Sequence, residues 1–314
     1  MGGGIGLGRW GVALPPEALH WADDLETAGH AALVGGAAAC AYYESDDLEV
    51  QEKDAGEGRD IEGSPEARPG QATNPVTRAD HASNDVILEV LATRSGEPVL
   101  SEESPAPADR SGRLWVVDPL DGTKEFISRN GEFSVMVGLA VGGEARLGAV
   151  FEPAAGRLYL GIVGGGAWTV AHPEGDGRAS PLRIEGSPGQ PLRLIRSRSH
   201  PDAALARLEE RLQESPGRVR IVLSGSVGIK CASVARGGAD LYVHPVPYLK
   251  EWDTCAPEAV LRGAGGRVTD CRGKPLRYGK HDPVQPGGIF CARPDVYDDV
   301  APLVREIGCH LFET

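Results

Sequence analysis

Two aspartates that lie three residues apart have the types and spacing to bind a cation. They belong to residues 114–126, LWVVDPLDGTKEF, where a run of apolar residues leads directly into Asp118 and Asp121 follows. Asp-Pro and Asp-Gly each favour turns for local backbone reasons, so either pair alone indicates an ordinary turn. Two carboxylates at the end of a buried strand, however, repel each other and resist losing water. A divalent cation would explain both, because hard cations prefer carboxylate and carbonyl oxygens.

Further acids lie next to other predicted elements. Glu102 follows the apolar segment PVL, and Asp253 precedes a predicted helix in KEWDTCAPEAVL. Each has an ordinary alternative. Glu102 and Glu103 would suit a solvated loop, and Asp253 or Thr254 would suit the N-cap of a helix with Pro257 in its first turn. Their joint occurrence with the first two aspartates predicts an oxygen-rich Mg²⁺ site.

The segment DGTKEF, residues 121–126, adds a second element of a catalytic site. If a helix starts near Gly122, its first amide groups point outward with a partial positive charge. Glycine also lets an anion approach the backbone closely, so this turn suits a phosphate group. Carboxylates, a metal and a phosphate site together predict metal-assisted transfer of a phosphoryl group to water.

The overall composition argues against several other classes of function. The 314 residues carry a formal net charge of −13 and the pI is near 5.1, so we expect no nucleic-acid partner and no membrane partner. No apolar run is long enough to span a bilayer, and the N-terminal region lacks a signal-peptide pattern. The six cysteines include no C-x-x-C pair, which is typical of reduced thiols in a cytosolic protein. We therefore expect a cytoplasmic location.

Hydrophobic patterning predicts two halves. Helices are expected at residues 21–49 and 79–92, and a run of strands with glycine turns from Phe133 onward indicates a large antiparallel sheet. Residues 171–190 are the best linker candidate. Beyond this linker, strands alternate with helical segments, which predicts an α/β second half. The helical segments are expected at residues 203–213, 227–236 and 256–262.

The first 18 residues are rich in glycine and proline, and we expect them to be poorly ordered. Residues 6–11, GLGRWG, match the letters of a G-x-G-x-x-G nucleotide-binding motif. Because no strand is predicted before them, they do not predict a dinucleotide site.

Several of these segments resemble one known family. SEES (residues 101–104), WVVDPLDGTKEF (115–126) and EWDTCAPEAVLRGAGGRVTD (251–270) resemble the inositol-monophosphatase-like phosphatases, which are Mg²⁺-dependent and lithium-sensitive. WDTCAPE, RSRSH and GSVGIK make the chain most similar to the 3′(2′),5′-bisphosphate nucleotidases of that family. The resemblance covers roughly residues 20 to 310.

The resemblance implies a fold. It is the five-layer αβαβα sandwich of the inositol monophosphatase and fructose-1,6-bisphosphatase type, within the α/β class. An α+β metal- and phosphate-binding domain would span residues 20–178, and an α/β nucleotide-binding domain would span residues 179–314. The chain would act as a monomer or a homodimer.

The resemblance also implies roles for individual residues. Two or three Mg²⁺ ions would be held by Glu102, Asp118, the carbonyl group of Leu120, Asp121 and Asp253. Catalysis would involve Glu102, Thr123 and Asp121, with Thr123 and Glu102 orienting the attacking water. Substrate contacts would come from Gly122, Thr123, Ser197, His200, Gly225, Ser226, Lys230 and Asp253. His200 and Lys230 also suit ordinary solvated surface positions.

One position departs from the family pattern. Bisphosphate nucleotidases carry an aspartate just before their V-T-x-A-D segment, where it helps to activate water, and this chain has Asn74 there. Asparagine cannot accept a proton. Either Glu102 and Thr123 suffice, or Asp80 or a loop acid such as Asp54 or Asp60 contributes, or activity is low.

The expected activity is Mg²⁺-dependent hydrolysis of the 3′-phosphate of adenosine 3′,5′-bisphosphate (PAP) to give AMP, with the sulfated nucleotide PAPS as a further substrate. The family suggests a place in sulfate assimilation. An inositol monophosphatase or a fructose-1,6-bisphosphatase of the same fold is the alternative among enzymes. A non-catalytic regulator that binds nucleotide or metal is the alternative from another class.

Overall fold

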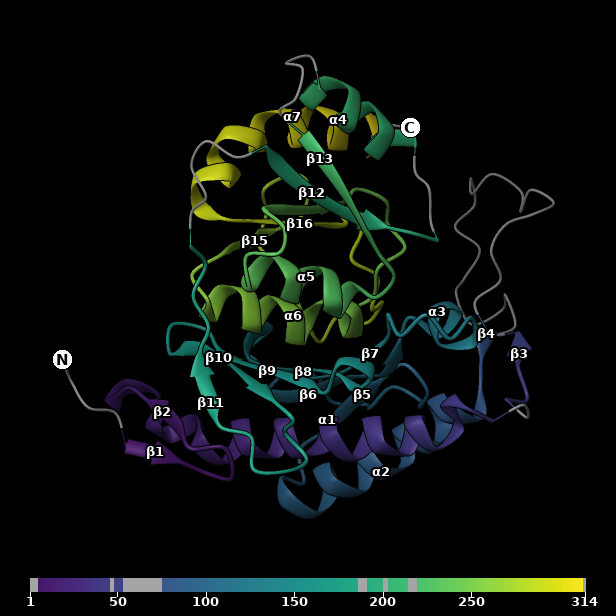
Figure 1. Cartoon of the computed structure of the whole chain (residues 1–314), viewed down its shortest axis with the longest axis vertical. Helices are drawn as coiled ribbons and strands as arrows, with labels where there is room; N and C mark the ends of the chain where they lie inside the picture. The colour runs from purple at the N-terminus through teal and green to yellow at the C-terminus, as the bar shows by residue number, and fades with distance from the viewer. Residues whose placement is uncertain are drawn as a thin grey trace.

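The computed structural model describes residues 5–45, 48–52, 75–185, 191–199, 203–213 and 219–312. Within this part of the chain, helices and sheets alternate in five layers, which Figure 1 shows edge-on. From the bottom of the view upward, a helix pair, a seven-stranded sheet, a second helix pair, a five-stranded sheet and a third helix pair follow one another. This order confirms the predicted αβαβα sandwich.

Three pairs of helices form the α layers (Figure 1). The outer pair below the larger sheet is α1 (Ala22–Tyr43) and α2 (Arg78–Arg94), the central pair is α5 (Val227–Ala235) and α6 (Glu251–Gly263), and the outer pair above the smaller sheet is α4 (Ala203–Gln213) and α7 (Pro294–Phe312). The remaining helical segments are η1 (Pro16–Trp21), α3 (Thr123–Ile127) and η2 (Pro153–Ala155). Among the helices of the described residues, none is long and apolar enough to cross a bilayer.

The larger sheet has the strand order β11-β10-β9-β8-β7-β6-β5. Its strands are β5 (Val99–Ser101), β6 (Arg113–Asp121), β7 (Ser134–Val141), β8 (Glu144–Glu152), β9 (Arg157–Ile162), β10 (Gly166–Ala171) and β11 (Ala179–Pro181). All neighbours are antiparallel except β5 and β6, as predicted for this half. Because helices cover both faces, β7 is buried along nearly its whole length and reads as a continuous apolar run.

Glycines let α6 lie unusually close to the larger sheet. A Cβ atom built on Gly148 of β8 would lie 2.5 Å from the Cα atom of Ala256, and one built on Gly161 of β9 would overlap the backbone of Val260. Gly138 of β7 faces the same helix. Only residues without a side chain permit this contact, so these three glycines set the height of α6 above the sheet.

The smaller sheet has the order β13-β12-β14-β16-β15. Its strands are β12 (Leu192–Ser197), β13 (Val219–Ser224), β14 (Leu241–His244), β15 (Arg267–Thr269) and β16 (Ile289–Ala292). Both β13 and β14 run parallel to β12, whereas β16 is antiparallel to its two neighbours. The carboxyl ends of three parallel strands therefore meet at one edge of the sheet, the usual place for a ligand site in such sheets.

The N-terminal segment differs from the prediction of poor order. Residues 5–14 form a hairpin of β1 (Ile5–Leu7) and β2 (Val12–Leu14). Gly8 and Gly11 adopt φ angles of 70° and 65° in its turn, so these glycines serve a tight turn. Trp10 is 2% exposed and donates its indole N–H to the carbonyl oxygen of Pro173 at 3.1 Å, which fixes the hairpin to the body of the fold.

Two predicted boundaries shift. Helix α1 ends at Tyr43 instead of near residue 49, and a short strand pair, β3 (Gln51–Glu52) with β4 (Pro75–Val76), follows later in the chain. Strand β11 pairs with β10, so the larger sheet extends to Pro181, past the predicted domain boundary at residue 178. The division into two domains itself stays a prediction.

Candidate active site

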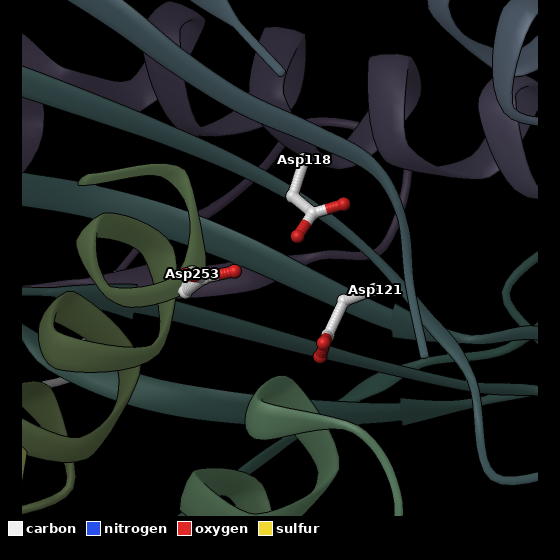
Figure 2. Close-up of side chains that lie close together, drawn as sticks. All are labelled: Asp118, Asp121 and Asp253. Atoms are coloured by element: carbon white, nitrogen blue, oxygen red, sulfur yellow. The ribbon is translucent and has the colours of Figure 1, made fainter. Parts of the chain in front are cut away.

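Three aspartates from two elements converge between the sheet and the central helix layer. Among the described residues, Asp118, Asp121 and Asp253 form a group in which one carboxylate oxygen from each lies within 4.8 Å of the others. The first two come from the end of β6, and the third comes from the first turn of α6 (Figure 2). Asp118 is 1% exposed and Asp121 is 9% exposed.

An irregularity in β6 explains how Asp118 and Asp121 come together. Residues three apart on a regular strand point to opposite faces. The pairing with β7 shifts register between these two residues, around Pro119, and this shift turns both carboxylates toward the same region. The backbone N–H of Leu120 donates to Oδ1 of Asp118 at 3.1 Å, and Ser83 of α2 donates to the carbonyl oxygen of Pro119 at 2.7 Å. These bonds hold the irregular segment in place.

Asp121 lies at the N-terminus of α5. Its Oδ2 atom accepts hydrogen bonds from the backbone N–H of Gly228 at 2.8 Å and from the hydroxyl groups of Ser226 and Ser134. Burial raises the pKa of Asp121, while the ammonium group of Lys230 and the Ser226 and Gly228 donors act in the opposite direction. Ser226 also caps α5 by accepting from the N–H of Ile229, so its hydroxyl group is committed to structure on two sides.

Asp253 is a strongly perturbed acid of this group. Burial raises its pKa well above the usual value, and the negative charges of Glu102 and Asp121 raise it further. The backbone N–H of Lys250 donates to Asp253 at 2.5 Å and partly opposes this rise. Three buried carboxylates at such short separation need protons or a cation to offset their charge. A set of carboxylate oxygens with nearby backbone carbonyl groups fits a hard divalent cation.

Glu102 lies beside this group without joining its tightest part. Its backbone N–H donates to the carbonyl oxygen of Val117 at 3.2 Å, which ties the turn after β5 to β6. Its charge raises the pKa of both Asp80 and Asp253, so its carboxylate lies within electrostatic reach of each.

Asn84 of α2 clamps the turn that carries Glu102. Its Oδ1 atom accepts from the hydroxyl group of Ser101 at 2.6 Å, and its Nδ2 atom donates to the hydroxyl group of Ser104 at 3.0 Å. These two serines flank Glu102 and Glu103 in the sequence. Asn84 is 3% exposed, so the clamp is shielded from water and its hydrogen bonds are correspondingly strong.

Thr123 and Asp80 form a second polar pair next to the aspartates. The hydroxyl group of Thr123 lies 3.1 Å from Oδ1 of Asp80 and 3.3 Å from the carbonyl oxygen of Leu120, and both oxygens are acceptors. The other oxygen of Asp80 accepts from the backbone N–H of Thr77 at 2.8 Å and from its hydroxyl group at 2.6 Å. Asp80 thus completes the capping box of α2 and contacts Thr123 at once. Burial raises its pKa, and the donors from Thr77 oppose that rise.

A short helix begins beside Gly122, as predicted. Gly122 adopts φ 95° at the N-cap of α3, and a Cβ atom at this position would lie 2.9 Å from the carbonyl oxygen of Glu132. Both observations require glycine here. The turn at Gly122 separates Asp121, at the end of β6, from Thr123, the first residue of α3.

The predicted substrate residues of the second half gather at the edge where the parallel strands end. Ser197 closes β12, and Gly225 follows β13. Lys230 is 1% exposed; its ammonium group donates to the carbonyl oxygen of Gly225 and lies 5.4 Å from the ring centroid of Tyr242. Burial lowers the pKa of Lys230, while the charge of Asp121 opposes this. Lys230 is therefore buried, which excludes the alternative of a solvated surface lysine.

A buried acid that the sequence interpretation missed lies at the same edge. Glu125 of α3 is 4% exposed and accepts a hydrogen bond from the hydroxyl group of Ser199. A Cβ atom on Gly225 would overlap the Glu125 side chain, so the glycine makes room for it.

Four residues named in the sequence interpretation lie outside the described residues: Asn74, Asp54, Asp60 and His200.

The comparison with family models gives a clear result. Residues 21–308 match the model of the inositol monophosphatase family. The chain belongs to the inositol monophosphatase family. The predicted resemblance is thereby confirmed.

Curated relatives within the family are more specific. The chain is 41% identical over 209 residues to the 3′(2′),5′-bisphosphate nucleotidase CysQ of Escherichia coli K12, an alignment that covers 65% of this chain and 80% of that protein. It is 33% identical over 243 residues to the 3′-phosphoadenosine 5′-phosphate phosphatase of Mycobacterium leprae, covering 73% and 81%. The sequence similarity therefore points to the bisphosphate nucleotidase branch.

Solved structures of the family share the fold. CysQ from Bacteroides thetaiotaomicron superposes with a TM-score of 0.69 at 29% identity, covering 88% of this chain and 99% of that one. An inositol monophosphatase from Anabaena gives a TM-score of 0.67 at 24% identity, covering 90% and 95%. At the latter identity the likeness supports the fold alone, which agrees with the five-layer sandwich described above.

Proposed function

We propose that this chain is a divalent-cation-dependent phosphomonoesterase that removes the 3′-phosphate of PAP to give AMP and phosphate, and that it also accepts PAPS. The observation that carries the proposal is the convergence of Asp118, Asp121 and Asp253 on one point beside Thr123. The names of the curated relatives favour a nucleotide bisphosphate over other phosphate esters.

The metal would be Mg²⁺, in two or three positions. Its ligands would be Glu102, Asp118, the carbonyl group of Leu120, Asp121 and Asp253. When bound, such ions neutralise the buried carboxylates, polarise the phosphate group and make a water molecule more acidic. The burial of Asp118 and Asp121, with the partly buried Asp253 beside them, supports this assignment, because a divalent cation would offset their mutual repulsion.

Thr123 would orient the attacking water. A threonine hydroxyl group has one hydrogen and two acceptor lone pairs. If the hydrogen points to Asp80, as their 3.1 Å separation allows, the lone pairs of Thr123 are free to accept a hydrogen from water. Asp80 would thereby supply a carboxylate, which Asn74 lacks, and Glu102 would also take part.

The phosphate that leaves would contact the amide groups of Gly122 and Thr123. The remaining parts of the nucleotide would meet the second half of the chain, where the expected contacts are Ser197, His200, Gly225, Ser226 and Lys230. Lys230 would balance the charge of the second phosphate. Lys230 donates to the carbonyl oxygen of Gly225 and lies within electrostatic range of Asp121, so it would also offset the negative charge of the metal ligands.

A panel of substrates tests the proposal. The purified protein would be assayed for phosphate release with Mg²⁺ from PAP, PAPS, inositol 1-phosphate and fructose 1,6-bisphosphate, with and without a chelator. We expect the highest kcat/KM for PAP and complete loss with the chelator. A preference for inositol 1-phosphate or fructose 1,6-bisphosphate would replace the substrate assignment, and nucleotide binding without any phosphate release would indicate a non-catalytic regulator.

A further inference from the structure

Tyr248 is a large aromatic side chain that the described contacts leave in solvent. It is 70% exposed, more than any other large apolar side chain among the described residues, where the next values are 50% for Val50 and 41% for Leu223. An exposed aromatic ring costs free energy in water, and rings of this kind are enriched where proteins bind ligands. Its surroundings decide what such a ring would meet.

The backbone that carries Tyr248 is held firmly. Residues 245–250 connect β14 to α6, and the carbonyl oxygen of Leu249 accepts from the backbone N–H of Gln285 at 2.8 Å. Lys250 pairs with Val284 in an isolated antiparallel bridge. The side chain of Leu249 is 6% exposed and belongs to a hydrophobic cluster. Because Leu249 points into the core, its neighbour Tyr248 is presented outward from an ordered loop.

The same loop touches the metal-binding group. The N–H of Lys250 donates to the carboxylate of Asp253 at 2.5 Å. Tyr248 is only two residues earlier, so standard backbone dimensions place its Cα atom within about 9 Å of that carboxylate. A tyrosine ring extends several bonds further. The base of a nucleoside whose 3′-oxygen lies at the aspartates is therefore within reach of this ring.

The loop also leaves the smaller sheet at the edge where its parallel strands end. It begins directly after His244, at the carboxyl end of β14. This is the edge at which Ser197 ends the parallel neighbour β12 and Ser224 ends β13, which runs parallel to β12 on its other side. A ligand whose phosphate lies at the aspartates and whose body extends over this edge passes the loop.

We propose that Tyr248 is the stacking surface for the purine base of the substrate. The inference rests on the proposed function, because it concerns the part of a nucleotide bisphosphate that a simple sugar phosphate lacks. Stacking needs only the flat face of the base and an exposed ring, and no specific hydrogen bond. Tyr248 would thus contribute to the selection of nucleotides over inositol phosphates and sugar phosphates.

The test compares ligands with and without a base. In Tyr248→Ala, KM for PAP and the inhibition constant of the product AMP should both rise by about 5- to 100-fold, the range expected for the loss of one stacked base. The inhibition constant of the other product, inorganic phosphate, should stay unchanged, as should kcat. Tyr248→Phe keeps the ring and should behave like the original chain. Leu19→Ala, which truncates an exposed side chain of η1, serves as the matched surface control.

The possible results separate cleanly. Unchanged AMP inhibition in Tyr248→Ala would overturn the inference, and so would an equal weakening of AMP and inorganic phosphate. A change of oligomeric state without a change in AMP affinity would show that Tyr248 contacts a second copy of the chain. AMP binding is also measured directly by calorimetry. If the original chain binds AMP through Tyr248 but releases no phosphate from PAP, the proposed function fails while this inference stands.

Discussion

The hydroxyl oxygen of Thr123, at the start of α3, lies 3.1 Å from Oδ1 of Asp80, in the first turn of α2. The two residues are 43 positions apart in the sequence. The same carboxylate accepts the N–H and hydroxyl groups of Thr77, so it links the capping of a helix to the group that would orient water. Helix capping and the proposed orientation of water therefore depend on one side chain, and substitution can separate them.

Asp80→Asn should lower kcat strongly while changing KM little. The amide would lose the charge that draws the Thr123 hydrogen away from the attacking water, and loss of such a positioned group commonly costs roughly 10²- to 10⁴-fold in rate. The measurement is the kcat and KM of PAP hydrolysis. Thr77→Ala is the matched control, because it removes the capping contacts, costs about 1 kcal/mol of stability and leaves Thr123 facing Asp80. Equal losses of kcat in both variants would contradict the assignment.

The stabilisation of the protein by Mg²⁺ should grow with pH. The pKa values of Asp121 and Asp253 are raised in the metal-free fold, so their contribution to stability is complete below the ordinary aspartate pKa of about 3.9. That contribution is lost as pH rises through the raised values, because the buried groups then become charged. Mg²⁺ binds the charged forms, so the rise in melting temperature that it causes should grow as pH rises above the ordinary aspartate pKa of about 3.9.

Thermal melts with and without Mg²⁺ measure this effect. Asp121→Asn removes one charged ligand and should abolish turnover. It should also reduce the rise in melting temperature that Mg²⁺ causes, while the metal-free fold stays as stable as before or becomes more stable. The metal site at these aspartates would be contradicted if the rise in melting temperature caused by Mg²⁺ did not depend on pH. It would also be contradicted if Asp121→Asn left that rise unchanged.

Lys230→Ala should impair PAP hydrolysis more than hydrolysis of a monophosphate. Loss of one charge-assisted contact to the second phosphate would raise KM for PAP by about 10- to 150-fold, or roughly 1.5–3 kcal/mol. The comparison substrate is inositol 1-phosphate, measured at the same ionic strength because salt screens charge. Equal effects on both substrates would show that the buried ammonium group instead offsets the charge of Asp121.

Asn84→Ala should weaken the response to Mg²⁺. The clamp on Ser101 and Ser104 holds the turn that carries Glu102, and loss of such support for a metal ligand typically costs about 10- to 100-fold in metal affinity. The readouts are the Mg²⁺ concentration for half-maximal activity and direct Mg²⁺ titration by calorimetry. Ser104→Ala removes only one of the two bonds and should have a smaller effect. Unchanged Mg²⁺ affinity in Asn84→Ala would refute a positioning role.

The positions that sequence reasoning located best are those whose signal is local. Asp118, Asp121 and Gly122 lie within one short segment, and a strand that ends in acids followed by glycine indicates its chemistry directly. Asp253 was named as a candidate from its position before a predicted helix, but only the packing of α6 on the sheet brings it to the other two. The five-layer fold followed from the family resemblance, whereas the alternation of strands and helices predicted only an α/β second half.

Other residues carry a stronger local signal for something else. Asp80 was named only as one of several acids that could contribute in place of an aspartate at position 74, because Thr77 and Asp80 form a capping-box pattern that explains Asp80 fully without Thr123. Glu125 looks like a solvated acid in a short helix, and only the chain reversal that brings Ser199 and Gly225 over it shows that it is buried. The hairpin at residues 5–14 was missed because its glycines indicated disorder, whereas the burial of Trp10 stabilises it.

The contact between Gly148 and Ala256 makes catalysis depend on a residue that has no side chain. Asp253 lies three positions before Ala256 on α6, so a methyl group at position 148 would push the helix outward and carry the carboxylate away from its two partners. A natural variant with alanine there would retain every acid that a motif search inspects, and we expect it to have lost most of its metal affinity. Divergent family members should therefore be judged by this glycine as well as by their aspartates.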